Sequence, residues 1–104
     1  MRKGKLVRDK IPEIIEKDGK KPITRIASRT ECEARLGEKL QEEVSEFLES
    51  GKTEELADIL EVIRAICDLR GISHEDLEKI RNKKLEERGG FKKRIILERI
   101  SGQK

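Results

Sequence analysis

Two pairs of carboxylates are the residues in this sequence best suited to chemistry. Glu43 and Glu46 lie three residues apart in K-L-Q-E-E-V-S-E, and Glu55 and Asp58 lie three apart in E-E-L-A-D-I-L-E. In a helix, residues at this spacing share one face. Carboxylates gathered at one place repel one another unless a cation lies among them, and their oxygens are ligands that Mg²⁺ and Mn²⁺ prefer. The spacing therefore predicts a divalent-metal site.

The two pairs face each other only if their helices fold back on one another at Ser50-Gly51. Each pair is centred about six residues from this turn, or roughly 9 Å at the helical rise per residue. An antiparallel hairpin would therefore bring all four carboxylates to one level. The alternative is that they are solvated residues of surface helices, where most charged side chains lie. The matched spacing on both sides of the turn favours the metal site.

The distribution of charge indicates what such a metal would bind. Of the 22 acidic residues, eleven lie between Glu31 and Glu61, whereas ten Lys or Arg lie in residues 1–29 and eight between Lys79 and Arg94. An acidic centre that holds a metal, flanked by basic segments, can neutralise the oxygens of a phosphate chain. The net charge is only +3 and the chain has no Tyr or Trp for base stacking. We therefore expect no nucleic-acid partner.

The elements that would position these residues are helices. Apolar residues at helical spacing, with capping residues before them, predict four helices. They are expected over residues 11–18, 30–50, 53–70 and 73 to 87 or 88. Thr30, Thr53 and Ser73 are the expected N-caps of the last three. The predicted fold class is mainly α, an antiparallel helical bundle that forms a single domain over residues 1–104.

Two short segments have the character of strands. Residues 22–28 alternate between apolar and polar side chains around Ile23 and include β-branched residues. Residues 94–100 are mostly aliphatic. Their pairing would give a small two-stranded element, which must pack on the helices because such a ribbon is marginal alone.

The apolar residues also bear on assembly and location. The helix from Glu54 to Arg70 carries apolar residues over more than half its circumference, which predicts a homodimer or homotetramer in which helices of a second copy cover it. Cys32 and Cys67 have no partner motif for zinc, and we expect Cys67 in the core. The sequence has no run of apolar residues long enough to span a membrane and no apolar leader, so we expect a cytoplasmic protein with no membrane partner.

Three blocks of sequence resemble the MazG-type superfamily of all-α nucleoside triphosphate pyrophosphatases. K-L-V-R-D-K-I-P-E-I, E-E-L-A-D-I-L-E-V-I and E-E-R-G-G-F are similar to its small, stand-alone house-cleaning branch, and the similarity extends over most of the chain, from Lys5 to Phe91. The resemblance implies hydrolysis of a nucleoside triphosphate, non-standard or surplus, between the α and β phosphates. The products would be a nucleoside monophosphate and pyrophosphate, and the cofactor would be Mg²⁺, with Mn²⁺ as a substitute.

The resemblance also assigns roles to residues. The family's metal ligands match Glu43, Glu46, Glu55 and Asp58. Glu42 matches a catalytic position, where it would orient the attacking water or hold a second metal. Residues similar to the family's phosphate-binding positions are Asn82, Lys84 and Arg88, and the N-terminal block adds Lys5 and Arg8, expected to reach phosphate or ribose.

Two alternatives to this function remain open. The first keeps the chemistry but takes phosphoribosyl-ATP as substrate, as in histidine biosynthesis. The second is a non-enzymatic helical interaction module, which would not bind Mg²⁺. The preferred base is also open, because only Phe47 and Phe91 could stack on it.

Overall fold

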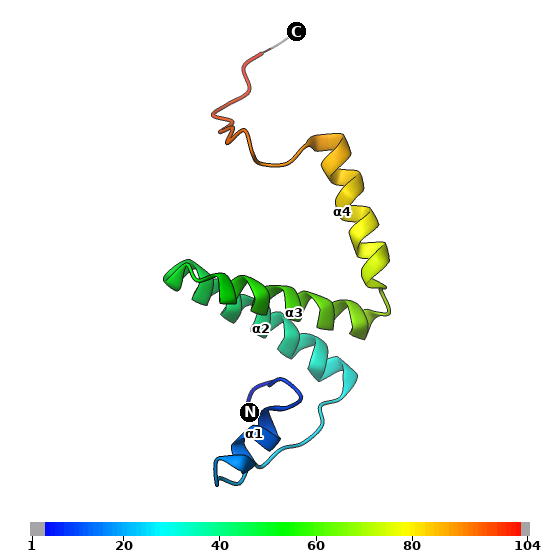
Figure 1. Cartoon of the computed structure of the whole chain (residues 1–104). Helices are drawn as coiled ribbons and strands as arrows, with labels where there is room; N and C mark the ends of the chain where they lie inside the picture. Colours follow the sequence, from blue (N-terminus) through cyan, green and yellow to red (C-terminus); the bar gives the residue numbers. More distant parts are fainter. Residues whose placement is uncertain (1–3, 103–104) are drawn as a thin grey trace. The chain divides into compact units, whose positions relative to one another are not determined.

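The computed structural model of the protein describes residues 4–102, and four helices account for its regular structure (Figure 1). Their bounds are α1 Ile11–Lys17, α2 Arg29–Ser50, α3 Thr53–Arg70 and α4 His74–Arg88. The prediction of a mainly α fold is confirmed. None of these helices is long and apolar enough to cross a membrane.

The predicted two-stranded element is wrong, because no residue in the described range 4–102 forms a strand. Residues 22–28 and 94–100 are irregular instead. A two-stranded ribbon needs a surface on which to pack its apolar side chains. Ile23 and Ile26 have no such surface, since they are 93% and 95% exposed.

The helix starts were predicted with mixed success. Ser73 caps α4 as expected, its hydroxyl accepting a hydrogen bond from the Asp76 N–H at 3.0 Å. The cap of α2 is Ser28 and not Thr30, because the Ser28 hydroxyl accepts from the Glu31 N–H at 3.1 Å. The cap position of α3 is Lys52, so that Thr53 is already the first helical residue.

A tight turn folds α3 back along α2, and the two helices lie side by side in Figure 1. Gly51 makes the turn possible: it ends α2 in the left-handed conformation, with φ 67°, and its N–H bonds to the Phe47 carbonyl at 2.8 Å. Among the described residues the buried apolar side chains are Leu36, Val62 and Cys67. The prediction that Cys67 lies in the core is confirmed, and this core is small.

The chain forms two compact units. The first ends at Ile72 and contains α1, α2 and α3, with both carboxylate pairs and with Lys5 and Arg8. The second begins at Ser73 and contains α4, with Asn82, Lys84 and Arg88.

Candidate metal centre

The hairpin brings together carboxylates from both predicted pairs. Glu43 of α2 and Glu55 and Asp58 of α3 each offer a carboxylate oxygen, and these oxygens lie within 4.8 Å of one another. The arrangement follows from the helical spacing within each pair and from the turn between them. Three converging carboxylate oxygens are a donor set that suits a hard divalent cation.

Glu46 does not join that set. It forms a second group with Glu42 and Glu43, whose oxygens also lie within 4.8 Å of one another. The expectation of four carboxylates in one cluster is therefore corrected to two groups that share Glu43. The reason lies in α2, where Glu43 is buried and Glu46 lies further round the helix, exposed to solvent.

Glu43 is the least accessible of these acids. Its side chain is only 8% exposed. Its Oε2 lies 3.5 Å from the Lys39 Nζ, whereas its Oε1 is buried and accepts no hydrogen bond from any residue that the structure describes. A buried carboxylate oxygen without a partner is costly, and a coordinated cation is one way to compensate that cost. The donor set and this oxygen both fit a divalent metal ion.

Lys39, which is not among the predicted site residues, lies beside both acidic groups. Its Nζ donates a hydrogen bond to Glu42 Oε1 at 2.9 Å. This bond, with the attraction of Glu42 and Glu43, raises the pKa of Lys39 above its usual value. The same bond is the main cause that lowers the pKa of Glu42, and the charges of Lys39 and Lys5 lower it further. In the sequence, Lys39 lies three residues before Glu42 and four before Glu43, a helical spacing that indicates contact with both acids.

The N-terminal segment, residues 4–10, supplies a second cation. Arg8 Nη2 donates to Asp58 Oδ1 at 2.7 Å, in a contact that joins the segment to α3 and stays open to solvent. Lys5 is close enough to Glu42 to influence its pKa. Both predicted substrate-binding residues of this segment therefore lie beside the acidic groups.

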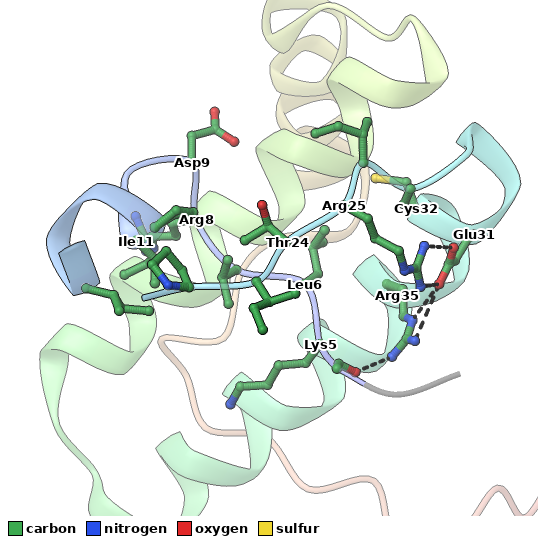
Figure 2. A pocket seen from close by; sticks show the side chains of 18 residues that line it. Lys5, Leu6, Arg8, Asp9, Ile11, Thr24, Arg25, Glu31, Cys32 and Arg35 are labelled. Carbon is green, nitrogen blue, oxygen red and sulfur yellow. Dashed lines mark hydrogen bonds and ion pairs between the residues drawn. The ribbon is translucent and has the colours of Figure 1, made fainter. Parts of the chain in front are cut away.

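A hydrogen bond and an ion pair at the start of α2 connect it to this segment and to residues 22–27 (Figure 2). Arg35 Nη1 donates to the Gly4 carbonyl at 2.8 Å. Glu31 accepts two bonds from Arg25, at 2.8 and 2.6 Å, and one from the Arg35 Nε at 3.4 Å. No motif in the sequence marks Arg25, Glu31 or Arg35 for a role.

A cavity of about 880 Å³ lies among the N-terminal segment, residues 22–27 and the start of α2 (Figure 2). Half of its 18 lining residues are apolar, among them Leu6, Ile11 and Ile15. Lys5 and Arg8 also line it, and the same two residues interact with Glu42 and Asp58 of the acidic groups.

The remaining predicted site residues lie on α4, in the second unit. Asn82, Lys84 and Arg88 are exposed, and the Asn82 amide is engaged locally, donating to Glu78 at 3.4 Å. Their role in phosphate binding stays a prediction.

No protein-family model, curated protein or solved structure matches this chain.

Proposed function

We propose that the protein hydrolyses a nucleoside triphosphate between the α and β phosphates, with Mg²⁺ as cofactor. The observation that carries the proposal is Glu43: a buried carboxylate with an unpartnered oxygen, shared by two groups of acids, beside which basic side chains of the N-terminal segment lie. A metal among acids with cations around it is the environment that a phosphate chain requires.

The metal would be held by Glu43, Glu55 and Asp58, whose oxygens converge. When bound, Mg²⁺ spreads the charge that develops on the phosphates and lowers the pKa of bound water. Glu46, at the exposed side of the second group, would support the metal from outside or hold a second one.

The residues around the metal have roles of their own. Glu42 is the carboxylate that we assign to orient the attacking water, and Lys39, which donates to it at 2.9 Å, holds it in position and lowers its pKa. Arg8 and Lys5 bind phosphate oxygens, and one N–H of the Arg8 guanidinium bonds to Asp58.

Pyrophosphate release tests this function. Standard, oxidised and deaminated nucleoside triphosphates, together with phosphoribosyl-ATP, would be incubated with the protein in Mg²⁺, and pyrophosphate measured against time. We expect release from at least one triphosphate, lost in EDTA and lost in Glu43→Gln. A protein that neither binds nor is thermally stabilised by millimolar Mg²⁺ contradicts the proposal and favours the interaction module.

A further inference from the structure

We propose that the cavity beside the acidic groups binds the nucleoside of the triphosphate, so that the N-terminal segment separates a base site from a phosphate site. This inference rests on the proposed function and assigns a place on the protein to the nucleoside part of the substrate. It names the occupant as a nucleoside 5′-triphosphate.

The chemistry of the cavity suits such a ligand. Its apolar side chains offer aliphatic surface to the faces of a base. Its charged lining residues are four basic and two acidic, an excess that favours an anionic ligand. The cavity of about 880 Å³ lies within the range of roughly 300–1,000 Å³ that is typical of small-molecule sites.

The continuity with the acidic groups fixes the orientation. Arg8 lines the cavity and at the same time donates to Asp58 at 2.7 Å. Lys5 lines the cavity and at the same time acts on Glu42. A ligand with an apolar end in the cavity therefore places its anionic end between these two cations and the acids that would hold the metal.

Two contacts connect the walls of the cavity to α2. Arg35 of α2 holds the Gly4 carbonyl on one wall, and Glu31 of α2 holds Arg25 on the other (Figure 2). Both walls are thus connected to the same helix, and a site whose walls are already in place costs less free energy on binding. Ile23 and Ile26, almost fully exposed in the second wall, are side chains that a bound base would cover.

Alkylation of Cys32 reports directly on this cavity. Cys32 lines it and is partly exposed, whereas Cys67 is only 4% exposed and serves as the internal reference. The rate of Cys32 modification by iodoacetamide would be measured by peptide mass spectrometry in Mg²⁺ alone, with a non-hydrolysable α,β-methylene nucleoside triphosphate, and with inorganic tripolyphosphate. At ten times its Kd we expect the nucleotide to slow the reaction about tenfold. Tripolyphosphate, which has no nucleoside, should slow it less than about twofold at the same saturation. Equal protection by both ligands, or by neither, overturns the inference.

A pair of variants on α1 gives an independent test. Ile15 lines the cavity, whereas Ile14 is its neighbour on α1, is 55% exposed and does not line it. Ile15→Trp fills part of the cavity and should weaken nucleotide binding about tenfold or more, while Ile14→Trp should not. Both variants should bind tripolyphosphate and Mn²⁺ as the wild type does, as measured by calorimetry. Unchanged nucleotide binding in folded Ile15→Trp contradicts the inference.

The outcomes separate the inference from the proposed function. Selective protection of Cys32 without any pyrophosphate release keeps the nucleoside site and rejects the hydrolysis. Pyrophosphate release without selective protection keeps the hydrolysis and rejects the site.

Discussion

Arg8 Nη2 lies 2.7 Å from Asp58 Oδ1, although the two residues are fifty positions apart in the chain. The pair connects the N-terminal segment to α3 and places a guanidinium on one of the three carboxylates that we assign to the metal. A divalent ion attracts a carboxylate more strongly than a single positive charge does. Metal binding and this ion pair therefore compete, and the metal would release Arg8 for a phosphate.

Replacing Arg8 tests two contacts at once: the one with Asp58 and the proposed one with phosphate. Arg8→Gln should raise the affinity for Mn²⁺ without nucleotide by about two- to fivefold, because Asp58 no longer has a competing cation. The same variant should raise KM for the triphosphate about tenfold or more, since a charge-assisted phosphate contact is lost. Calorimetry and steady-state kinetics measure the two effects. Lys10→Gln, which removes the same charge from the same exposed segment, is the matched control, and equal Mn²⁺ affinities in both variants would show that no competition exists.

The buried acid Glu43 should be indispensable for metal binding and dispensable for folding. Glu43→Gln removes a charge that the fold keeps away from water, so its thermal midpoint in EDTA should equal or exceed that of the wild type. Turnover should fall about hundredfold or more, because the residue belongs to both acidic groups. In saturating Mg²⁺ the wild type should gain roughly 2–3 kcal/mol of stability at one hundred times Kd, and the variant none. Differential scanning calorimetry with and without Mg²⁺ gives the result, and Glu49→Gln, an exposed acid of the same helix, is the control. Full stabilisation of Glu43→Gln by Mg²⁺ would refute the ligand assignment.

The contact between Lys39 and Glu42 should give stability a defined pH dependence. Because the pKa of Glu42 is lowered in the folded protein, its contribution is present above the unfolded pKa of about 4.3 and is lost as the pH falls through the folded value. Because the pKa of Lys39 is raised, its contribution is complete below about 10.4 and is lost only as the pH rises through its folded value.

Lys39→Met should therefore have a lower urea midpoint than the wild type at pH 7, and the difference should shrink as the pH falls below about 4. Lys20→Met, an exposed lysine outside the helices, should differ little from the wild type at any pH. A deficit of Lys39→Met that stays constant from pH 3 to pH 7 would mean that lost packing, and not charge, causes it.

The sequence predicts the helices of this protein better than their boundaries. Helical periodicity extends over many residues and tolerates a local error, whereas a cap depends on one hydroxyl. At the start of α2, Ser28 with Glu31 and Thr30 with Glu33 both fit a capping box, and the pattern cannot choose between them. The structure starts the helix at Arg29, where Glu31 bonds to Arg25 and Arg35. The contact with Arg35 is a local pair at helical spacing, whereas the contact with Arg25 comes from the irregular residues before the helix, which the capping pattern does not contain.

The candidate site was predictable where spacing alone determines geometry. Glu43, Glu55 and Asp58 converge because helix rise and a two-residue turn leave little freedom. Glu46 was misplaced because a small difference in angle on the helix separates a buried acid from an exposed one. The pairing of Arg8 with Asp58 could not be predicted from spacing, since it depends on the path of an irregular segment.

The exposed apolar residues of the hairpin predict that the protein assembles. Leu48 on α2 and Leu60 on α3 are 77% and 61% exposed, on helices whose own core is small. Burying such side chains against a second copy stabilises a dimer by about 1.5–3 kcal/mol for each leucine, and four-helix packing of two hairpins is the arrangement that we expect. Light scattering at micromolar concentration should give at least twice the 12.0 kDa of one chain.

Leu60→Glu tests whether this surface is the interface. A charge at the centre of an apolar contact should weaken association about a hundredfold or more and yield monomers, because the carboxylate is desolvated without a partner. Leu97→Glu, which adds the same charge at a site 73% exposed in the second unit, should leave the mass unchanged. A wild-type mass of one chain would mean that the small core of the hairpin suffices alone. A dimer that persists in folded Leu60→Glu would mean that the copies meet through another surface.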